Sequence, residues 1–282
     1  MTTPTTRPST ARPPATLPPT GDAAARRTAY RVTFARVLRS EWHKLWSLRS
    51  TWAVILTSAA LVLGVGTAMG ATYTSDGGDS DVDTVVLVLY GTMLAQVVLA
   101  VLGILVTAGE YTTGMIRASL TAVPSRLPVL WAKAAVFTVT AFAVSLATAL
   151  VTFVTAQLLL ADTDQAASLV DPGVLRAITG NSAGITLVSL IALGIGAVVR
   201  SVPGSIGAFV GGVLVVPEIL SVLPYEATDT ALTYFPSQAA AALGSATPLP
   251  GAATPGAALL ALTLWVGAAL GAAGLSLKRR DV

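Results

Sequence analysis

The sequence predicts an all-α membrane protein in which an amphipathic interfacial helix precedes six transmembrane helices and both termini are cytoplasmic. Hydrophobic residues make up 54% of the 282 residues and charged residues 11%, and the mean hydropathy is +0.74. Ordinary soluble domains are far less apolar. The apolar residues form long runs, and nearly all basic residues lie on one side of those runs. These observations together predict a multi-pass membrane protein.

Residues 1–29 predict a disordered, proline-rich cytoplasmic tail. The tail carries Pro4, Pro8 and four further prolines among Thr, Ala and Arg, with almost no large apolar side chain to bury. It lacks the short apolar core of a signal peptide, because the first apolar run begins only at Trp52. We therefore expect it to remain in the mature protein.

Residues 30–50 predict an amphipathic helix that lies in the membrane interface. Apolar and aromatic side chains such as Val37 and Trp42 recur at helical spacing, and basic side chains occupy the opposite face. Glu41 falls on the apolar side and breaks this pattern. The basic side chains face anionic lipid or a cytoplasmic partner, or the helix serves only as a topological anchor, and the sequence leaves these alternatives open.

Residues 51–282 predict a six-helix transmembrane domain. A helix needs about 20 apolar residues to cross the hydrocarbon core, and six segments meet this requirement. The third is longer than a span requires and is expected to tilt or to project from the bilayer. The predicted spans lie near residues 52–71, 84–108, 128–160, 182–199, 205–223 and 256–277.

The charges between the spans predict the orientation. With six spans, all of the 17 Lys and Arg residues except Arg176 fall on the side of the two termini. The positive-inside rule makes that side cytoplasmic. The opposite side gathers most of the acidic residues: Asp76, Asp79, Asp81, Asp83, Asp162, Asp164, Asp171, Glu226 and Asp229.

No catalytic, cofactor-binding or metal-binding residues are predicted. The sequence has no phosphate-binding GxxxxGK[S/T] loop, no cysteine and a single histidine, His43, which removes the common nucleotide, zinc and triad motifs. The acidic segment 75–83 lacks the spacing of a calcium loop and is interpreted as a solvated turn. The chain is therefore not expected to be an enzyme.

Three polar residues inside the spans are candidates for a solute path: Gln96, Gln157 and Glu218. The two glutamines could equally well form contacts between helices. Glu218 lies near the outer end of its span, where it could equally well be a carboxylate at the membrane interface without a transport role.

Glycines and prolines around Gly211 and Pro217 predict an irregular fifth helix. A short helix is expected near residues 237–243. Glycine pairs such as Gly66/Gly70 and Gly207/Gly211 allow close helix approach.

The order of these features resembles the bacterial ABC-2 type transporter permeases. The resemblance rests on SEWHKLWSLRS (residues 40–50), on EYTTGMIRASLTAVPSRLPVLWAK (110–133) and on YFPSQAA (234–240). It implies a multi-pass subunit of the cell membrane that works with an ABC ATPase subunit and a second permease subunit, as a homodimer or a heterodimer. ATP and magnesium would bind the ATPase, and a substrate would be exported or extruded from the lipid. The partners are these proteins and the lipid bilayer; no nucleic acid is expected.

The loop between the second and third spans is the expected contact with the ATPase. A helix over residues 112–122, ended by Pro124 and Pro128, would receive the motor's displacement. Arg126 and Lys133 could also bind lipid phosphates. In a further alternative, all the charges of the loop only fix the orientation of the protein in the membrane. The candidate coupling residues are Glu110, Tyr111, Thr113, Arg117 and Arg126.

Two other functions remain open from the sequence. A non-transporting membrane scaffold or accessory subunit would present the same loop to a partner. A secondary carrier would transport without ATP, although such carriers more often show a chain of carboxylates or histidines near the membrane midplane.

Overall fold

The computed structural model describes residues 33–73, 83–115, 127–222, 226–247 and 251–279. The chain divides into two units, Met1–Thr33 and Phe34–Val282, and every described helix lies in the second. These residues form helices and connecting turns and include no β-strand. The predicted all-helical class is confirmed. The predicted tail over residues 1–29 and most of the acidic segment 75–83 lie outside the described ranges.

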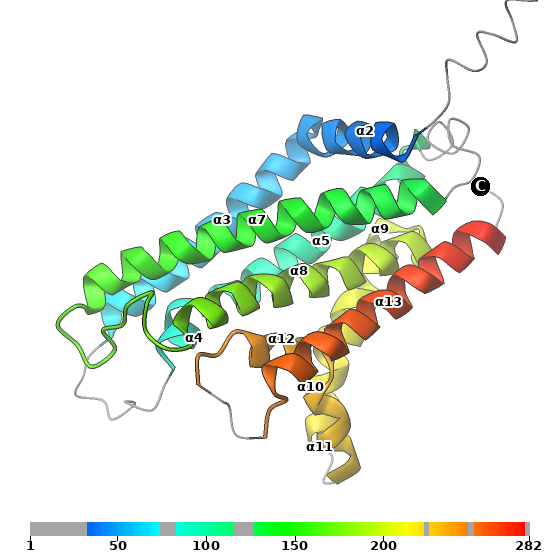
Figure 1. Cartoon of the computed structure of the whole chain (residues 1–282). Coiled ribbons are helices and arrows are strands. Elements are labelled where there is room, and N and C mark those ends of the chain that lie inside the picture. The colour runs from blue at the N-terminus through cyan, green and yellow to red at the C-terminus, as the bar shows by residue number, and fades with distance from the viewer. Residues whose placement is uncertain (1–32, 74–82, 116–126, 223–225, 248–250, 280–282) are drawn as a thin grey trace, which may run out of the picture. The chain divides into compact units, whose positions relative to one another are not determined.

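Six helical segments are long and apolar enough to cross a membrane (Figure 1). This fits the predicted multi-pass membrane protein. The third segment is the longest, as predicted, with 34 residues. The six are α3 (Arg49–Thr72), α5 (Thr92–Thr112), α7 (Leu127–Leu160), α8 (Val174–Val199), the segment Val202–Ser221 that begins with α9 (Val202–Phe209), and α13 (Pro255–Arg279).

The second span differs from its predicted range of 84–108. A separate short helix, α4 (Thr84–Val88), precedes α5, and the chain turns between them. Gly91 packs directly against α3 at this turn, because a Cβ atom there would lie 2.7 Å from the carbonyl oxygen of Leu61. Apolar residues run through both helices, so hydropathy could not reveal the break.

The fourth and fifth spans also depart from their predicted ranges. Helix α8 begins at Val174 rather than at residue 182, after Gly173, whose φ of 88° suits glycine. The fifth span continues from α9 through the π-helix η2 (Val210–Val215) into α10 (Val216–Ser221). Pro217 has no backbone N–H to donate within the helix. The predicted irregularity of the fifth span thus takes the form of a π-helical segment.

A short helix, α12 (Pro236–Leu243), follows α11 (Glu226–Thr233) and confirms the helix predicted near residues 237–243. It packs against α8 and α13, and three of its alanines, Ala239, Ala240 and Ala242, are buried. Gly180 and Gly184 of α8 make the close approach possible, since a Cβ atom on Gly180 would clash with the Leu243 carbonyl oxygen.

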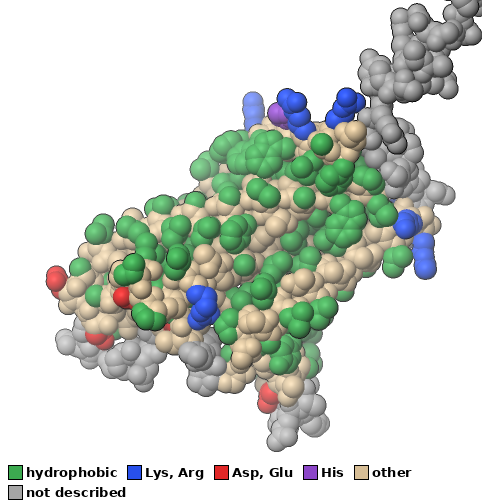
Figure 2. Space-filling model, in the orientation of Figure 1, with side chains coloured by type: hydrophobic (Ala, Val, Ile, Leu, Met, Phe, Trp, Pro, Cys, Tyr) green, Lys and Arg blue, Asp and Glu red, His purple; other side chains and the backbone are tan. Residues whose placement is uncertain are grey.

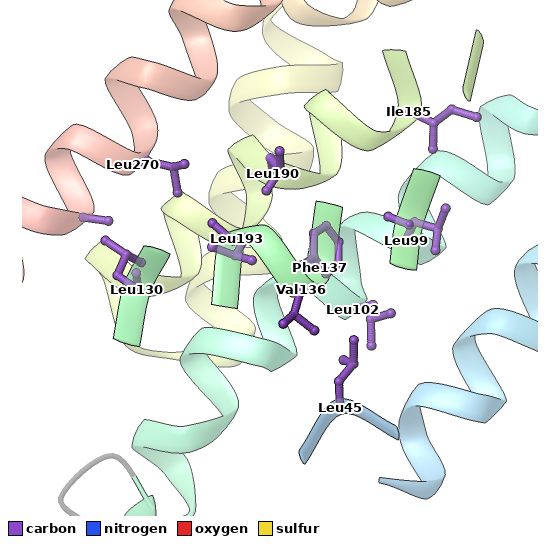
Figure 3. Packing of buried hydrophobic residues seen from close by; sticks show 14 of the residues in the cluster. Leu45, Leu99, Leu102, Leu130, Val136, Phe137, Ile185, Leu190, Leu193 and Leu270 are labelled. Atoms are coloured by element: carbon purple, nitrogen blue, oxygen red, sulfur yellow. The ribbon is translucent and has the colours of Figure 1, made fainter. Parts of the chain in front are cut away.

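The centre of the bundle is the contact between α5 and α8, and α8 is the most buried of the six spans. Gly103 of α5 lies against the Ser189 carbonyl, and Thr107 Oγ1 donates to the Leu193 carbonyl oxygen at 3.0 Å. The largest buried hydrophobic cluster surrounds this contact (Figure 3). It includes Leu45, Leu99, Leu102, Leu130, Val136, Phe137, Ile185, Leu190, Leu193 and Leu270.

Helix α2 (Phe34–Ser47) precedes α3 and packs against α7 and α3. It ends at Ser47, before the end of the predicted range of 30–50, because the chain is extended at Leu48 before α3 begins. Residues 30–32 of that range lie outside the described residues. Val37, Glu41 and Leu45 are its buried residues. Trp42 is 40% exposed, and its ring lies 5.7 Å from the ring of Trp46, centre to centre, with the two planes tilted by 49°. Whether α2 lies in a membrane interface stays a prediction.

Charged residues separate between the two ends of the bundle (Figure 2). We call the end that holds α2 and the C-terminal end of α13 the basic end, and the opposite end, which holds Asp83 and Asp171, the acidic end. Every described Lys and Arg except Arg176 lies at or near the basic end. This separation agrees with the charge pattern of the sequence.

Asp83 joins α4 to residues 245 and 247 at the acidic end. Its Oδ1 caps the first turn of α4, and its Oδ2 accepts hydrogen bonds from Thr247 N at 2.7 Å and Ser245 Oγ at 2.9 Å. Arg176 of α8 donates to the Ser245 carbonyl oxygen at 3.0 Å. Burial would raise the pKa of the Asp83 carboxyl, but the hydrogen bonds from Thr247 and Ser245 hold that pKa below its ordinary value.

Candidate functional site

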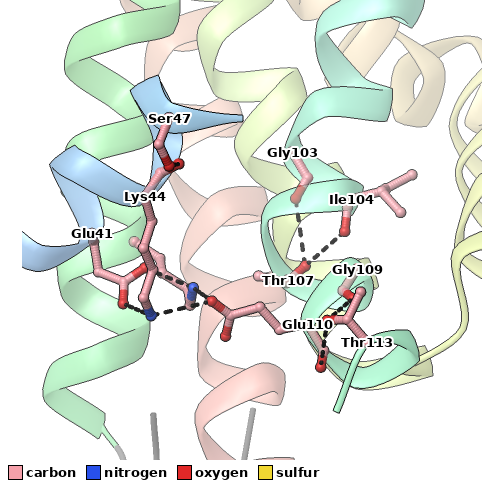
Figure 4. Close-up of polar contacts among 10 residues, drawn as sticks. Glu41, Lys44, Ser47, Gly103, Ile104, Thr107, Gly109, Glu110 and Thr113 are labelled. Carbon is pink, nitrogen blue, oxygen red and sulfur yellow. Dashed lines mark hydrogen bonds and ion pairs between the residues drawn. The ribbon is translucent and has the colours of Figure 1, made fainter. Parts of the chain in front are cut away.

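Four charged side chains from three helices meet at the basic end (Figure 4). Lys133 Nζ donates to Glu41 Oε2 at 2.7 Å and to Glu110 Oε1 at 2.6 Å. Lys44 Nζ donates to Glu41 Oε1 at 2.7 Å and lies 3.4 Å from Glu110 Oε1. Each lysine therefore contacts both glutamates. We call these four residues the charge cluster.

The helices place these side chains together for simple geometric reasons. Glu41 and Lys44 are three residues apart on α2, so they lie on neighbouring positions of one helical face. Glu110 stands near the end of α5, and Lys133 stands near the start of α7. Because α5 and α7 are joined by the loop between them, the cluster connects both ends of that loop to α2.

The cluster is largely withdrawn from solvent. The exposed fractions of Glu41, Glu110 and Lys133 are 6%, 8% and 5%. Burying a charge costs several kcal/mol, roughly, unless an opposite charge and hydrogen bonds compensate. Lys44 lies at the edge of the cluster. Burial would lower the pKa of its ammonium group, but the hydrogen bond with Glu41 and the charge of Glu110 outweigh it and raise that pKa.

One carboxylate oxygen of the cluster is not satisfied. Glu110 Oε1 accepts from both lysines, whereas Glu110 Oε2 is buried and has no hydrogen-bond partner among the described residues. Both oxygens of Glu41 are paired. The cluster thus retains one free acceptor on Glu110.

A second set of contacts ties the end of α5 to α8 and α13. The guanidinium carbon of Arg200 lies 5.0 Å from the centre of the Tyr111 ring, within the range of a cation–π contact. Arg200 also donates to the Ser276 carbonyl oxygen of α13 at 3.2 Å. Arg200 has a φ of 62° and ends α8. Contacts therefore link the end of α5 to α2, α7 and α8 and, through Arg200, to α13.

The structure brings three of the predicted coupling residues into this region. Glu110 belongs to the charge cluster, Tyr111 contacts Arg200, and Thr113 is exposed, with its hydroxyl donating to the Gly109 carbonyl oxygen at 3.0 Å. Arg117 and Arg126 lie outside the described residues, as does most of the predicted helix 112–122. The coupling role of all five residues stays a prediction.

The three polar residues predicted inside the spans lie on three different helices, and their role in a solute path stays a prediction. Gln96 is half-buried on α5. Gln157 Oε1 accepts from the backbone N–H of Ala167 at 2.8 Å, a contact that fixes the chain after α7. Glu218 is exposed on α10. No hydrogen bond joins these side chains to one another within the described part of the chain.

Sequence reasoning missed the partners of Glu110. Lipid phosphates were one alternative partner for Lys133, but its side chain is 5% exposed and contacts two carboxylates instead. Glu41 was the one available signal, since it interrupts the apolar face of its helix. A carboxylate on a buried face requires a cationic partner, and Lys133, 92 residues away, supplies it.

Comparisons with known proteins add no family assignment to these contacts. No protein-family model matches the sequence, and no curated protein matches it. Within the described residues, no group of three or more His, Asp or Glu side chains is arranged to hold a metal ion. The charge cluster is therefore interpreted from its own geometry.

Proposed function

We propose that the chain is the membrane-spanning permease subunit of an ATP-driven exporter of the ABC-2 type, located in the cell membrane. One observation carries the proposal: the charge cluster fastens both ends of the loop between α5 and α7 to α2. A subunit driven by a separate motor needs such a joint, because the motor's displacement must enter the membrane helices at a cytoplasmic loop.

The sidedness of the charges supports a cytoplasmic position for this joint. By the positive-inside rule, the basic end faces the cytoplasm together with α2, the end of α5 and the C-terminal end of α13, and the proposal therefore has both termini in the cytoplasm. An ATPase subunit would then dock beside α2 and the loop. A second permease subunit completes the assembly, as the family resemblance implies.

Burial assigns Glu110 a specific part in this mechanism. At 8% exposure and with two lysines bound, Glu110 transmits a displacement instead of contacting the ATPase directly. The displacement passes from the loop to α5, α7 and α2 through the charge cluster and to α8 through Tyr111 and Arg200. Packed helices shift between discrete arrangements, which gives the bundle two states for a motor to alternate.

The test is reconstitution of the full chain in liposomes with the ATPase that co-purifies with it. We expect ATP hydrolysis that is stimulated by a transported substrate, and export that stops when the ATPase is removed. The double variant Glu110→Met/Lys133→Met removes one carboxylate and one ammonium and leaves the Glu41–Lys44 pair at 2.7 Å. It should insert normally and lose most of the stimulation. Arg39→Gln changes an exposed charge of α2 and is the matched control.

Two outcomes would contradict the proposal. Transport that continues without any ATPase and stops when the ion gradient is collapsed would identify a secondary carrier. Partner binding without any solute movement would identify a scaffold.

A further inference from the structure

A cavity of about 320 Å³ lies beside the charge cluster at the basic end. Residues of α2, α3, α5 and α7 line it. Its walls are mainly apolar and include Leu45, Leu102, Leu105, Val106, Val136 and Phe137. Ligand pockets in proteins span roughly 300–1,000 Å³, so this cavity suits a small occupant.

Two polar atoms without partners belong to residues that line this cavity. Glu110 Oε2 and Thr51 Oγ1 are both buried, and neither has a hydrogen-bond partner among the described residues. Glu110 is 8% exposed and Thr51 is fully buried. Buried polar atoms in native proteins are nearly always satisfied. A carboxylate oxygen only accepts hydrogen bonds, so the missing partner of Glu110 is a donor.

The charge cluster also restricts the charge of the occupant. Two lysines and two glutamates sum to zero, and their contacts already pair every charge. An ionised ligand would leave one net charge in a largely apolar cavity, at a considerable desolvation cost. A neutral hydroxyl group supplies the donor without adding a charge.

The apolar walls indicate the remainder of the ligand. A water molecule needs two to four polar partners, roughly, to remain in a buried site, and the leucine, valine and phenylalanine side chains of the walls offer none, although hydroxyl and charged side chains line the rest of the cavity. An alkyl chain instead gains the transfer energy of apolar surface removed from water. The small volume suits a single chain better than the two chains of a phospholipid.

We propose that this cavity binds a neutral, single-chain amphiphile, such as a monoacylglycerol, whose hydroxyl headgroup donates to Glu110 Oε2. The alkyl chain lies against the leucine and valine side chains of α5 and α7. A headgroup with two hydroxyls also offers a partner to Thr51. This binding goes beyond the proposed export function and does not depend on it.

The test uses the full chain in phosphatidylcholine nanodiscs and a fluorescent monoacylglycerol that unlabelled probes displace. Monolaurin should displace the label roughly tenfold more effectively than methyl laurate, which has no donor. Laurate and dodecylamine, which are charged, should also displace it poorly. Equal displacement by methyl laurate, or tighter binding of either charged probe, would overturn the proposal.

Variants locate the binding. Leu105→Trp fills the cavity and should abolish displaceable binding, whereas Leu158→Trp, on a side chain of α7 that is 76% exposed, should leave it unchanged. Thr51→Val should weaken binding severalfold. Unchanged binding by Leu105→Trp in correctly folded protein would contradict the site, and this variant keeps the charge cluster intact.

A separate experiment identifies the source of the ligand. Mass spectrometry of protein extracted gently from membranes should find a neutral single-chain lipid on the wild type and none on Leu105→Trp if the bilayer supplies it. Wild-type protein that carries no lipid yet binds monolaurin in the titration would indicate a free pool instead. Absence of both signals would refute the proposal.

Discussion

Lys133 Nζ lies 2.6 Å from Glu110 Oε1, and these two residues stand on opposite sides of the loop that joins α5 to α7. Their contact closes the base of this loop inside the protein. The loop is therefore anchored at both ends to side chains that are largely hidden from solvent, and a pull on either end acts on the same buried contact.

Removing one charge of this pair should destabilise the fold strongly. Lys133→Met leaves Glu110 without its shortest ion pair and Glu41 without one of its two lysines. A buried charge pair that loses one partner typically costs about 3–5 kcal/mol. Thermal unfolding in detergent, followed by tryptophan fluorescence, measures the loss. Arg39→Gln serves as the control, and a similar melting temperature for both variants would show that the pair is not effectively buried.

Removing both charges together should cost much less than removing one. In Glu110→Met/Lys133→Met the remaining Glu41 and Lys44 still balance each other, and apolar replacement of a buried pair is often neutral or stabilising. A double-mutant cycle of thermal stability gives the coupling energy of the pair. Strictly additive losses would mean that the two side chains do not interact in the native protein.

The packing of α5 on α8 should tolerate no side chain at Gly103. A Cβ atom there would lie 2.6 Å from the Ser189 carbonyl oxygen, so Gly103→Ala must push the helices apart, at a cost of about 1–3 kcal/mol. Gly109→Ala in the same helix meets no atom within 4 Å and is a matched control that should be neutral or slightly stabilising. Unfolding temperatures of the two variants decide the comparison.

At low pH, protonation of the Asp83 carboxylate should destabilise the acidic end. A carboxyl whose folded-state pKa is lowered stabilises the fold above its ordinary pKa, and this contribution is lost as the pH falls through the folded value. The protection factors of the α4 amides, which are the intrinsic exchange rates divided by the observed rates, should therefore fall as the pH drops below 3.8, the ordinary pKa of this carboxyl. Asp83→Asn keeps Oδ1 as the cap but cannot accept the Thr247 N–H at Oδ2, so α4 should exchange faster at neutral pH and depend less on acid. Equal pH profiles would exclude Asp83 as the titrating group.

The proposed orientation is testable because the chain has no cysteine. Val170→Cys, at an 89% exposed position of the acidic end, should react with a membrane-impermeant maleimide on intact cells. Lys278→Cys, near the end of α13, should react only after the membrane is permeabilised. The reverse pattern would invert the topology and put the charge cluster outside the cell.

Hydropathy predicted the existence of all six long helices, because each needs a run of apolar residues that no soluble fold requires. It failed where the chain's path depends on contacts rather than on composition. The break before α5 depends on Gly91 against Leu61 and on the cap at Asp83, and both lie within or beside one continuous apolar run. The early start of α8 follows in the same way from the turn at Gly173.

The candidate site was predictable in part. The loop and Glu110 stood out as polar residues between apolar runs. The pairing of Glu41 with Lys133 spans 92 residues and depends on how α2 crosses α7, which no local pattern specifies. The glycine pairs likewise show that a local pattern does not specify a contact. Gly66 packs against Val88 and Thr152, whereas a Cβ atom on Gly207 or Gly211 would meet no atom within 4 Å.

The neutrality of the charge cluster bears on how the protein would respond to membrane voltage. Moving one elementary charge across the membrane field involves about 2.3 kcal/mol per 100 mV. Two ammonium groups and two carboxylates that shift as one body transfer no net charge, so the field does almost no work on them. The rate of such a rearrangement should then be the same in energised and de-energised membranes.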